Sequence, residues 1–336
     1  MDPNVILPLL SSVASFVFGG LVFAQWLQRR RSFQLVWAIG LLWYGISAGT
    51  ELVGSAFGWS EPLYRAWYLI GAFFVAAYLG MGTVYLLAKT RFGYFVAVTL
   101  LLGGLFGLSI LGRYPDAGEL GLTVILFSLL AAAIVALTTW LKREWSGHAT
   151  MAALALGSVG VTYLVLTAQI AAPGWSVDPV THVPIGQAMP GAVRVLAAPF
   201  NIAGALALVF GALFSAYVFM PKRKVLRGRG LPPVVAQVYG GVAVGVNFLA
   251  SIPLAVGAAR RGELHSRVPA TLLIAIGGFI PGVTSGLNRF GFTWAFFLGE
   301  LVGVLFIFAG FLVSTEVFAS RARAAGPKLG TEVSSA

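Results

Sequence analysis

The sequence predicts an all-α, polytopic integral membrane protein. The expected bundle has about nine transmembrane helices plus one re-entrant or atypical apolar segment. Of the 336 residues, 58% are hydrophobic and 10% are charged, and the mean hydropathy is +0.89. A soluble domain has about 25% charged residues. Apolar runs long enough to span a bilayer recur along the chain, and the 22 lysines and arginines form short clusters between them.

Composition also excludes several classes of protein. The absence of cysteine excludes disulfides, thiolate metal sites and cysteine nucleophiles. The net charge of +11 does not indicate a nucleic-acid partner, because the basic residues lie in loops between apolar runs. This pattern is typical of cytoplasmic loops. The expected partner is therefore the lipid bilayer, and no nucleic acid.

The first seven spans are predicted at residues 5–26, 34–57, 64–88, 92–112, 121–141, 149–171 and 194–219. Their connections alternate between basic ones, such as "LQRRRS" and "MPKRKVLRGRG", and acidic or neutral ones rich in Pro and Gly, such as "GRYPDAGEL". Because cytoplasmic loops carry the excess of Lys and Arg, the N-terminus is predicted outside and residues 221–230 inside.

Three apolar segments remain, at residues 234–259, 269–285 and 291–318. If all three cross, the 22 lysines and arginines divide 13 inside to 9 outside. They divide 18 to 4 if 234–259 does not cross, and 15 to 7 if 269–285 does not. The positive-inside bias favours a non-crossing 234–259, although this segment is long enough to span. The loop "RRGELHSR" is then cytoplasmic.

This topology predicts three parts of the chain. Residues 1–220 form a seven-helix membrane domain, 221–318 a C-terminal membrane segment with basic cytoplasmic loops, and 319–336 a disordered cytoplasmic tail. The expected location is a cell membrane, of the bacterial inner-membrane type. The basic loop 222–229 sets topology and also suits anionic lipid head groups.

Small residues four apart indicate close helix packing. Such pairs are Gly299 with Gly303 and Gly241 with Gly245, and Ala72, Ala76 and Gly80 form a longer stripe. Packing within the chain is the favoured interpretation, and a dimer face is the alternative.

Acidic residues within the predicted spans are more informative about function. They are Glu51, Glu300 and Glu316. A charged side chain at the centre of a membrane helix costs about 2.5–3.5 kcal/mol or more, so each should have a partner or a wet site. Glu316 is expected at the inner interface, Arg65 is placed to pair with Glu51, and Arg289 with Glu300.

Other polar residues share the depth of the two outer glutamates. The hypothesis is a ligand-binding pocket open to the outside, suited to a cationic or hydrogen-bonding ligand. Its proposed residues are Glu51, Arg65, Tyr163, Gln169, Asn201 and Glu300. In particular, Glu51, Asn201 and Glu300 are predicted to line one cavity. The alternative is a set of separate hydrogen bonds between helices.

Patterns for catalysis, metals and cofactors are missing from the sequence. The three histidines, His148, His182 and His265, lie in loops or at helix ends. No H-E-x-x-H, G-x-S-x-G or P-loop pattern occurs. No catalytic residue, metal ligand or cofactor is therefore predicted, and an enzyme is disfavoured.

Two consecutive stretches carry a resemblance to known membrane proteins. They are "LVWAIGLLWYGISAGTEL" and "RAWYLIGAFFVAAYLG". In topology and aromatic placement, residues 1–220 resemble the seven-helix, N-terminus-out sensor regions of bacterial receptors. The resemblance implies a sensing or ligand-binding membrane module. In those receptors, however, the helices lead into kinase or cyclase domains, whereas here further apolar segments follow.

The favoured function is therefore a non-enzymatic membrane module. It would bind a small or lipophilic ligand, or other membrane-protein subunits, as a sensor or accessory protein. The alternative is a transporter for a small molecule or ion with its site in the outer half of the bilayer. A transporter would show inverted repeats and a wet path through the midplane.

Overall fold

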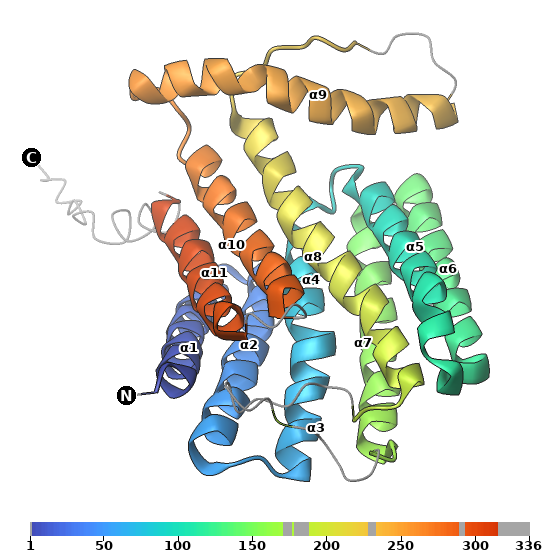
Figure 1. Ribbon diagram of the computed structural model, residues 1–336. Coiled ribbons are helices and arrows are strands. Elements are labelled where there is room, and N and C mark those ends of the chain that lie inside the picture. Colours follow the sequence, from blue (N-terminus) through green and yellow to red (C-terminus); the bar gives the residue numbers. More distant parts are fainter. Residues whose placement is uncertain (1, 171–176, 178–187, 228–232, 289–292, 315–336) are drawn as a thin grey trace, which may run out of the picture. The chain divides into compact units, whose positions relative to one another are not determined.

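The computed structural model describes residues 2–170, 177, 188–227, 233–288 and 293–314. Helices dominate these residues (Figure 1). The helices are α1 Pro3–Arg29, α2 Ser32–Phe57, α3 Glu61–Leu69, the π-helical η1 Ile70–Phe74, α4 Val75–Leu87, α5 Phe92–Ile110, the short η2 Leu111–Arg113 and η3 Pro115–Ala117, α6 Gly118–Leu141, the short η4 Arg143–Trp145, α7 Ser146–Thr167, α8 Gly191–Phe219, α9 Pro233–Arg260, α10 Arg267–Asn288 and α11 Thr293–Val313.

Within the described residues, ten helices are long and apolar enough to cross a membrane, with α3, η1 and α4 forming one continuous span. The chain is a multi-pass membrane protein, and the all-α fold class is confirmed. Each predicted apolar segment coincides with a helix. The end of the last one, with Glu316 and the predicted tail, lies outside the described residues, as does Arg289.

Local chemistry explains where the first helices begin and end. Asp2 caps α1, because its Oδ1 accepts a hydrogen bond from the backbone N–H of Asn4 at 2.9 Å, and proline follows at the first helical position. Arg30 ends α1 in the left-handed conformation, with φ of 50°. Gly58, at φ of 93°, ends α2. These two residues produce the short turns between the first three spans.

The structure comprises two compact units. The described residues of Met1–Ala212 and Ala275–Ile307 form the first unit, and those of Leu213–Ile274 and from Phe308 on form the second. In the first unit, α2 packs against α1 and α4, and α5 packs against α6.

Helices α4 and α8 approach each other at their backbones. A side chain at Gly80 would collide with the Gly204 carbonyl, and one at Gly204 would collide with the Ala76 carbonyl. Only glycine permits this approach. A side chain at Gly303 would likewise collide with Pro281 of α10. The predicted packing role is confirmed for Gly80 and Gly303, whereas nothing lies within 4 Å of the positions where Gly241 and Gly245 would carry a side chain.

The third span contains one irregular turn. Residues Ile70–Phe74 are π-helical, and the N–H of Val75 bonds to the carbonyl of Ile70, five residues back. A π turn disturbs the regular i to i−4 pattern, and such turns occur frequently at functional sites. Here it lies between α3, which carries Arg65 and Trp67, and the tightly packed α4.

In the second unit, α9 runs at a wide angle to the last turns of α8 and the first turns of α10 (Figure 1). Ala216 and Met220, at the end of α8, form a buried cluster with Ala255 of α9 and Val268 of α10. Gly262, with φ of 72°, lies in the turn between α9 and α10. This geometry describes the predicted atypical segment, and its position relative to a bilayer stays a prediction.

Candidate functional site

Two carboxyl groups from distant parts of the sequence meet inside the first unit. Glu51 lies on α2, six residues before its end, and Glu300 lies on α11, seven residues after its start. At 1.5 Å per residue, each is roughly 10 Å from its helix terminus. The two side chains are direct electrostatic neighbours. Glu51 is 1% exposed, so its carboxyl group is removed from solvent.

Two aromatic residues donate hydrogen bonds to these glutamates, one to a carboxyl group and one to a backbone carbonyl. The indole Nε1 of Trp67, on α3, donates a hydrogen bond to Oε1 of Glu51 at 2.8 Å. The hydroxyl of Tyr44, two turns before Glu51 on α2, donates to the backbone carbonyl of Glu300 at 2.7 Å. That hydroxyl is also within electrostatic range of both carboxyl groups. Three segments of the chain therefore converge on one point.

One oxygen of each carboxyl group lacks a donor among the described residues. Oε2 of Glu51 and Oε2 of Glu300 are buried and have no hydrogen-bond partner among the described residues. Neither glutamate takes part in an ion pair there. Two adjacent ionised carboxylates repel each other strongly when desolvated. The arrangement is therefore suited to hold a positive charge, either a proton shared between the groups or a small cation.

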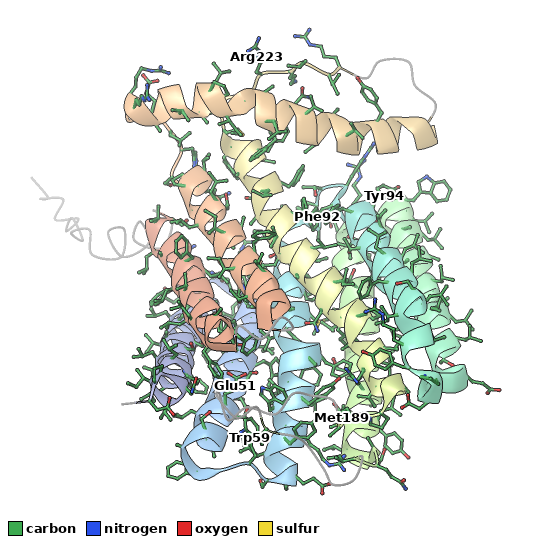
Figure 2. All side chains as sticks on the ribbon, viewed as in Figure 1. Glu51, Trp59, Phe92, Tyr94, Met189 and Arg223 are labelled. Atoms are coloured by element: carbon green, nitrogen blue, oxygen red, sulfur yellow. The ribbon has the colours of Figure 1, made fainter. Side chains whose placement is uncertain are left out.

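Aromatic side chains surround Glu51 at this end of α2. The ring of Trp59 lies 5.7 Å from that of Trp67, and Tyr64 and Tyr68 pack beside Trp67. A side chain at Gly54 would collide with Trp59, so this glycine admits the indole to the helix surface. Figure 2 labels Glu51 and Trp59 at this end of α2. Because Glu51 is almost inaccessible to solvent here, electrostatic interactions at the carboxyl pair are stronger than in water.

The predicted pairing of Arg65 with Glu51 is wrong. Arg65 binds Glu61 on its own helix at 2.7 Å and donates to the carbonyls of Val165 and Ala168, at the end of α7, at 2.5 and 2.8 Å. An acidic residue four positions earlier is already in reach on the helix surface. Arg65 therefore ties α3 to the C-terminus of α7. Glu51 is paired rather than lipid-facing, as predicted, but its partner Trp67 is not one of the expected kinds of partner, which were Arg, Tyr, Asn, Gln or water.

Asn201 lies elsewhere in the first unit. Its Nδ2 donates to the carbonyl of Ala72, inside the π-helical turn, at 2.7 Å. No hydrogen bond or ion pair in the described part of the chain joins it to Glu51 or Glu300. Asn201 thus stabilises the irregular turn of the third span from α8.

The two remaining predicted site residues are exposed. Tyr163 is 67% exposed on α7. Gln169 lies beyond the end of α7 at Thr167, rather than inside the sixth span as predicted. The helix ends here because Ala168 leaves the helical conformation, with ψ of 137°, and its carbonyl binds Arg65.

The sequence interpretation missed Tyr44 and Trp67. For both residues, the sequence contained a pattern that places them near Glu51. Tyr44 precedes Glu51 by seven residues and therefore lies on the same helix face. Trp67 is six residues into α3, and Glu51 is six residues from the end of α2, so the two are at matching depth across one short turn.

Two cavities accompany the site in the first unit. One, of about 70 Å³, is lined by small and apolar residues of α4 to α8 and by Ser128, whose buried hydroxyl has no partner among the described residues. The other, of about 500 Å³, lies beside Trp43, Arg65, Ile70 and Thr162. Neither is lined by Glu51 or Glu300, and the predicted cavity shared with Asn201 stays a prediction.

Metal-binding clusters of three or more His, Asp or Glu are not found within the residues that the structure covers. The site therefore consists of a carboxyl pair, a tyrosine and a tryptophan on three helical segments. No protein-family model, no curated protein and no solved structure matches this chain.

Proposed function

We propose that this multi-pass membrane protein is a non-enzymatic module that binds a cation, in the first place a proton, at the Glu51–Glu300 pair. One observation carries the proposal: two buried carboxyl groups are neighbours, and each keeps an oxygen without a donor among the described residues. Ionisable residues inside membrane spans mark ion and proton sites in many membrane proteins.

The chemistry of the surroundings favours a cation over an anion or a neutral acceptor. Tyr44 and Trp67 already donate their hydrogen atoms to the site. The buried Oε2 atoms of Glu51 and Glu300 only accept when ionised. A ligand must therefore bring a positive charge or a hydrogen-bond donor. A proton needs no cavity, which fits the close packing around Glu51.

The position of the pair supports a sensory or accessory role. Loss of the shared cation would leave two like charges on α2 and α11, and repulsion would then loosen the packing of these helices. Binding at one point is thereby coupled to helix arrangement. The resemblance of residues 1–220 to seven-helix sensor regions, drawn from topology and aromatic placement in the sequence, supports a sensing or ligand-binding role.

A second candidate is a cation transporter, and the π-helical turn favours it. Irregular backbone within a span, such as Ile70–Phe74, is found where transporters bind ions. The Ala72 carbonyl in this turn is bonded to Asn201 on a different helix. In proteoliposomes, a transporter would move protons or a metal cation across the membrane, whereas a module would not.

Thermal unfolding of the purified protein tests the proposal. A proton bound by the folded pair but not by the unfolded chain makes stability fall as pH rises, by at most about 1.4 kcal/mol per pH unit. Wild type should show this loss, and Glu51→Gln/Glu300→Gln should not, because two amides need no proton. Glu119→Gln, which changes an exposed carboxyl group, serves as the matched control and should behave as wild type.

Added Na⁺, K⁺ or alkylammonium ions distinguish the kinds of cation. An ion that binds the pair should raise the wild-type melting temperature at high pH and leave the double variant unchanged. If neither pH nor any of these ions separates wild type from the double variant, the proposal is wrong.

A further inference from the structure

The second unit carries an ordered basic surface that the carboxyl site does not use. It is formed by the extended segment Pro221–Arg227, which follows α8 and lies along α9. Its exposed basic residues are Lys222, Arg223, Lys224 and Arg227. Figure 2 shows Arg223 on this segment. We call these four residues the basic strip.

Two buried polar residues of α9 hold the backbone of the segment Pro221–Arg227, which carries the basic strip. Oδ1 of Asn247 accepts from the N–H groups of Val225 and Leu226 at 2.7 and 2.9 Å, and its Nδ2 donates to the Leu226 carbonyl at 3.0 Å. Oγ of Ser251 accepts from the N–H of Arg223 at 2.9 Å. Asn247 is 5% exposed and Ser251 0%. An extended segment has no helical partners for its backbone, so these side chains replace them.

One side chain of the strip, Lys222, and the nearby Arg267 lie over aromatic rings. Nζ of Lys222 lies 5.5 Å from the ring centre of Tyr217, and the guanidinium of Arg267 lies 4.5 Å from that of Phe219. Such contacts with aromatic rings restrict long basic side chains. The side chain of Lys222 is therefore restricted, and the backbone that carries all four cations is held in place before a ligand binds.

The charge of this surface is not neutralised by the described residues of the second unit. Glu263 is the one acidic residue in the sequence from 213 to 274, and it pairs with Arg261 at 2.8 Å. No ion pair involving the four basic residues occurs in the described part of the chain. Four neighbouring basic residues without an ion-pair partner in the described part of the chain are suited to bind an anion.

The surroundings of the strip indicate which anion. The face of α9 away from Asn247 and Ser251 exposes apolar side chains, among them Val242, Val246, Leu249, Ile252 and Val256. A helix with basic residues along one face and an exposed apolar face opposite is suited to the boundary between acyl chains and head groups. An anion attached to acyl chains satisfies both features, whereas a free anion satisfies only the charge.

We propose that the basic strip, held on α9 by Asn247 and Ser251, is a binding site for the phosphodiester head groups of anionic phospholipids. The exposed apolar face of α9 contacts the adjoining acyl chains. Each basic residue near an anionic surface strengthens binding by about 1 kcal/mol, or roughly fivefold in affinity. Holding the strip in place makes these contributions act together on one lipid or on adjacent lipids.

Titration of the full chain with phosphatidylglycerol in phosphatidylcholine-containing micelles, followed by melting temperature, tests this proposal. Lys222→Gln/Arg223→Gln/Lys224→Gln/Arg227→Gln should weaken the apparent affinity for phosphatidylglycerol by at least about tenfold. The matched control is Lys89→Gln/Arg91→Gln/Lys142→Gln/Arg143→Gln, which removes the same charge from exposed positions in two other loops. It should retain an affinity within about threefold of wild type.

A third variant separates a built site from charge alone. Asn247→Leu keeps every basic residue but removes three hydrogen bonds to the strip, and its affinity should fall between those of wild type and the fourfold variant. Equal losses in the fourfold variant and its control, or wild-type affinity in Asn247→Leu, would overturn the proposal. So would inorganic phosphate, if it shifted the melting temperature as phosphatidylglycerol does.

Discussion

Trp67 supplies the hydrogen bond that Glu51 receives within the described residues, and it does so from the next helix. Because the carboxyl group is buried, its Oε1 cannot exchange this donor for water. A buried acceptor left without its donor costs about 1–3 kcal/mol, more than a typical exposed hydrogen bond contributes. Trp67 is therefore a residue on which the stability of the carboxyl pair depends.

Trp67→Phe should lower the free energy of unfolding by about 1–3 kcal/mol, because Phe keeps the ring packing but removes the N–H. In a Glu51→Met background the same substitution should have a smaller effect, because the acceptor is gone. A double-mutant cycle from denaturant unfolding measures the coupling. Equal effects of Trp67→Phe in both backgrounds would mean that the hydrogen bond contributes nothing.

At this scale the sequence predicted that Glu51 is buried with a partner, because an unpaired carboxyl group within a span is too unfavourable. It did not identify the partner. Arg65 had the right charge and depth, but Glu61 lies four residues away on the same helix and binds it. A tryptophan in an apolar run looks like an ordinary packing residue until the neighbouring helix is known.

Helices α4 and α8 depend on each other through their glycines rather than through large side chains. Contact at the backbone brings many weak van der Waals interactions into range, which is the main source of association between helices in lipid. The π-helical turn immediately before α4, bound by Asn201 of α8, lies next to this contact. The crossing therefore fixes the position of the irregular turn.

Gly204→Ala should destabilise the protein by about 1–3 kcal/mol, because the added methyl group would force α4 and α8 apart. Gly160→Ala on α7 is the matched control. Nothing lies within 4 Å of the position of its added methyl group, so it should be neutral or stabilising by up to about 1 kcal/mol. Melting temperatures of the two variants provide the comparison, and equal values would contradict the close crossing.

Helix positions were largely predictable, because length and apolar composition decide whether a segment can span. The last residues of α7 were not, because Arg65 binds the end of this helix from another part of the chain. The π turn in "IGAFF" has no local sequence signal either. It is bonded instead by Asn201, 129 residues later, whose side chain donates a hydrogen bond to the Ala72 carbonyl.

For the whole molecule, the orientation in the membrane stays a prediction and can be tested directly. The chain has no cysteine, so single cysteines report their own position. Ser266→Cys should react with an impermeant thiol reagent from the same side as Ser32→Cys, in the first basic loop. Ser60→Cys, in the first neutral loop, should react from the opposite side. If Ser266→Cys behaves as Ser60→Cys, α9 crosses the membrane.

The meeting of Glu51 and Glu300 could not be deduced at this scale. Shared depth made it a hypothesis, but depth does not say which helices are neighbours. Asn201 has a similar predicted depth and bonds to the third span instead. Which polar groups converge is decided by the packing of helices that are far apart in sequence.

The separation between Tyr44 and Glu300, 256 residues along the chain, has a consequence for biosynthesis. The ribosome delivers Glu51 to the membrane long before Glu300 exists, so an early intermediate holds a lone carboxyl group among its first helices. The last helix completes the site when it arrives. The proposed cation binding therefore requires the assembled chain, and its appearance during translation would show that the first and last spans have packed together.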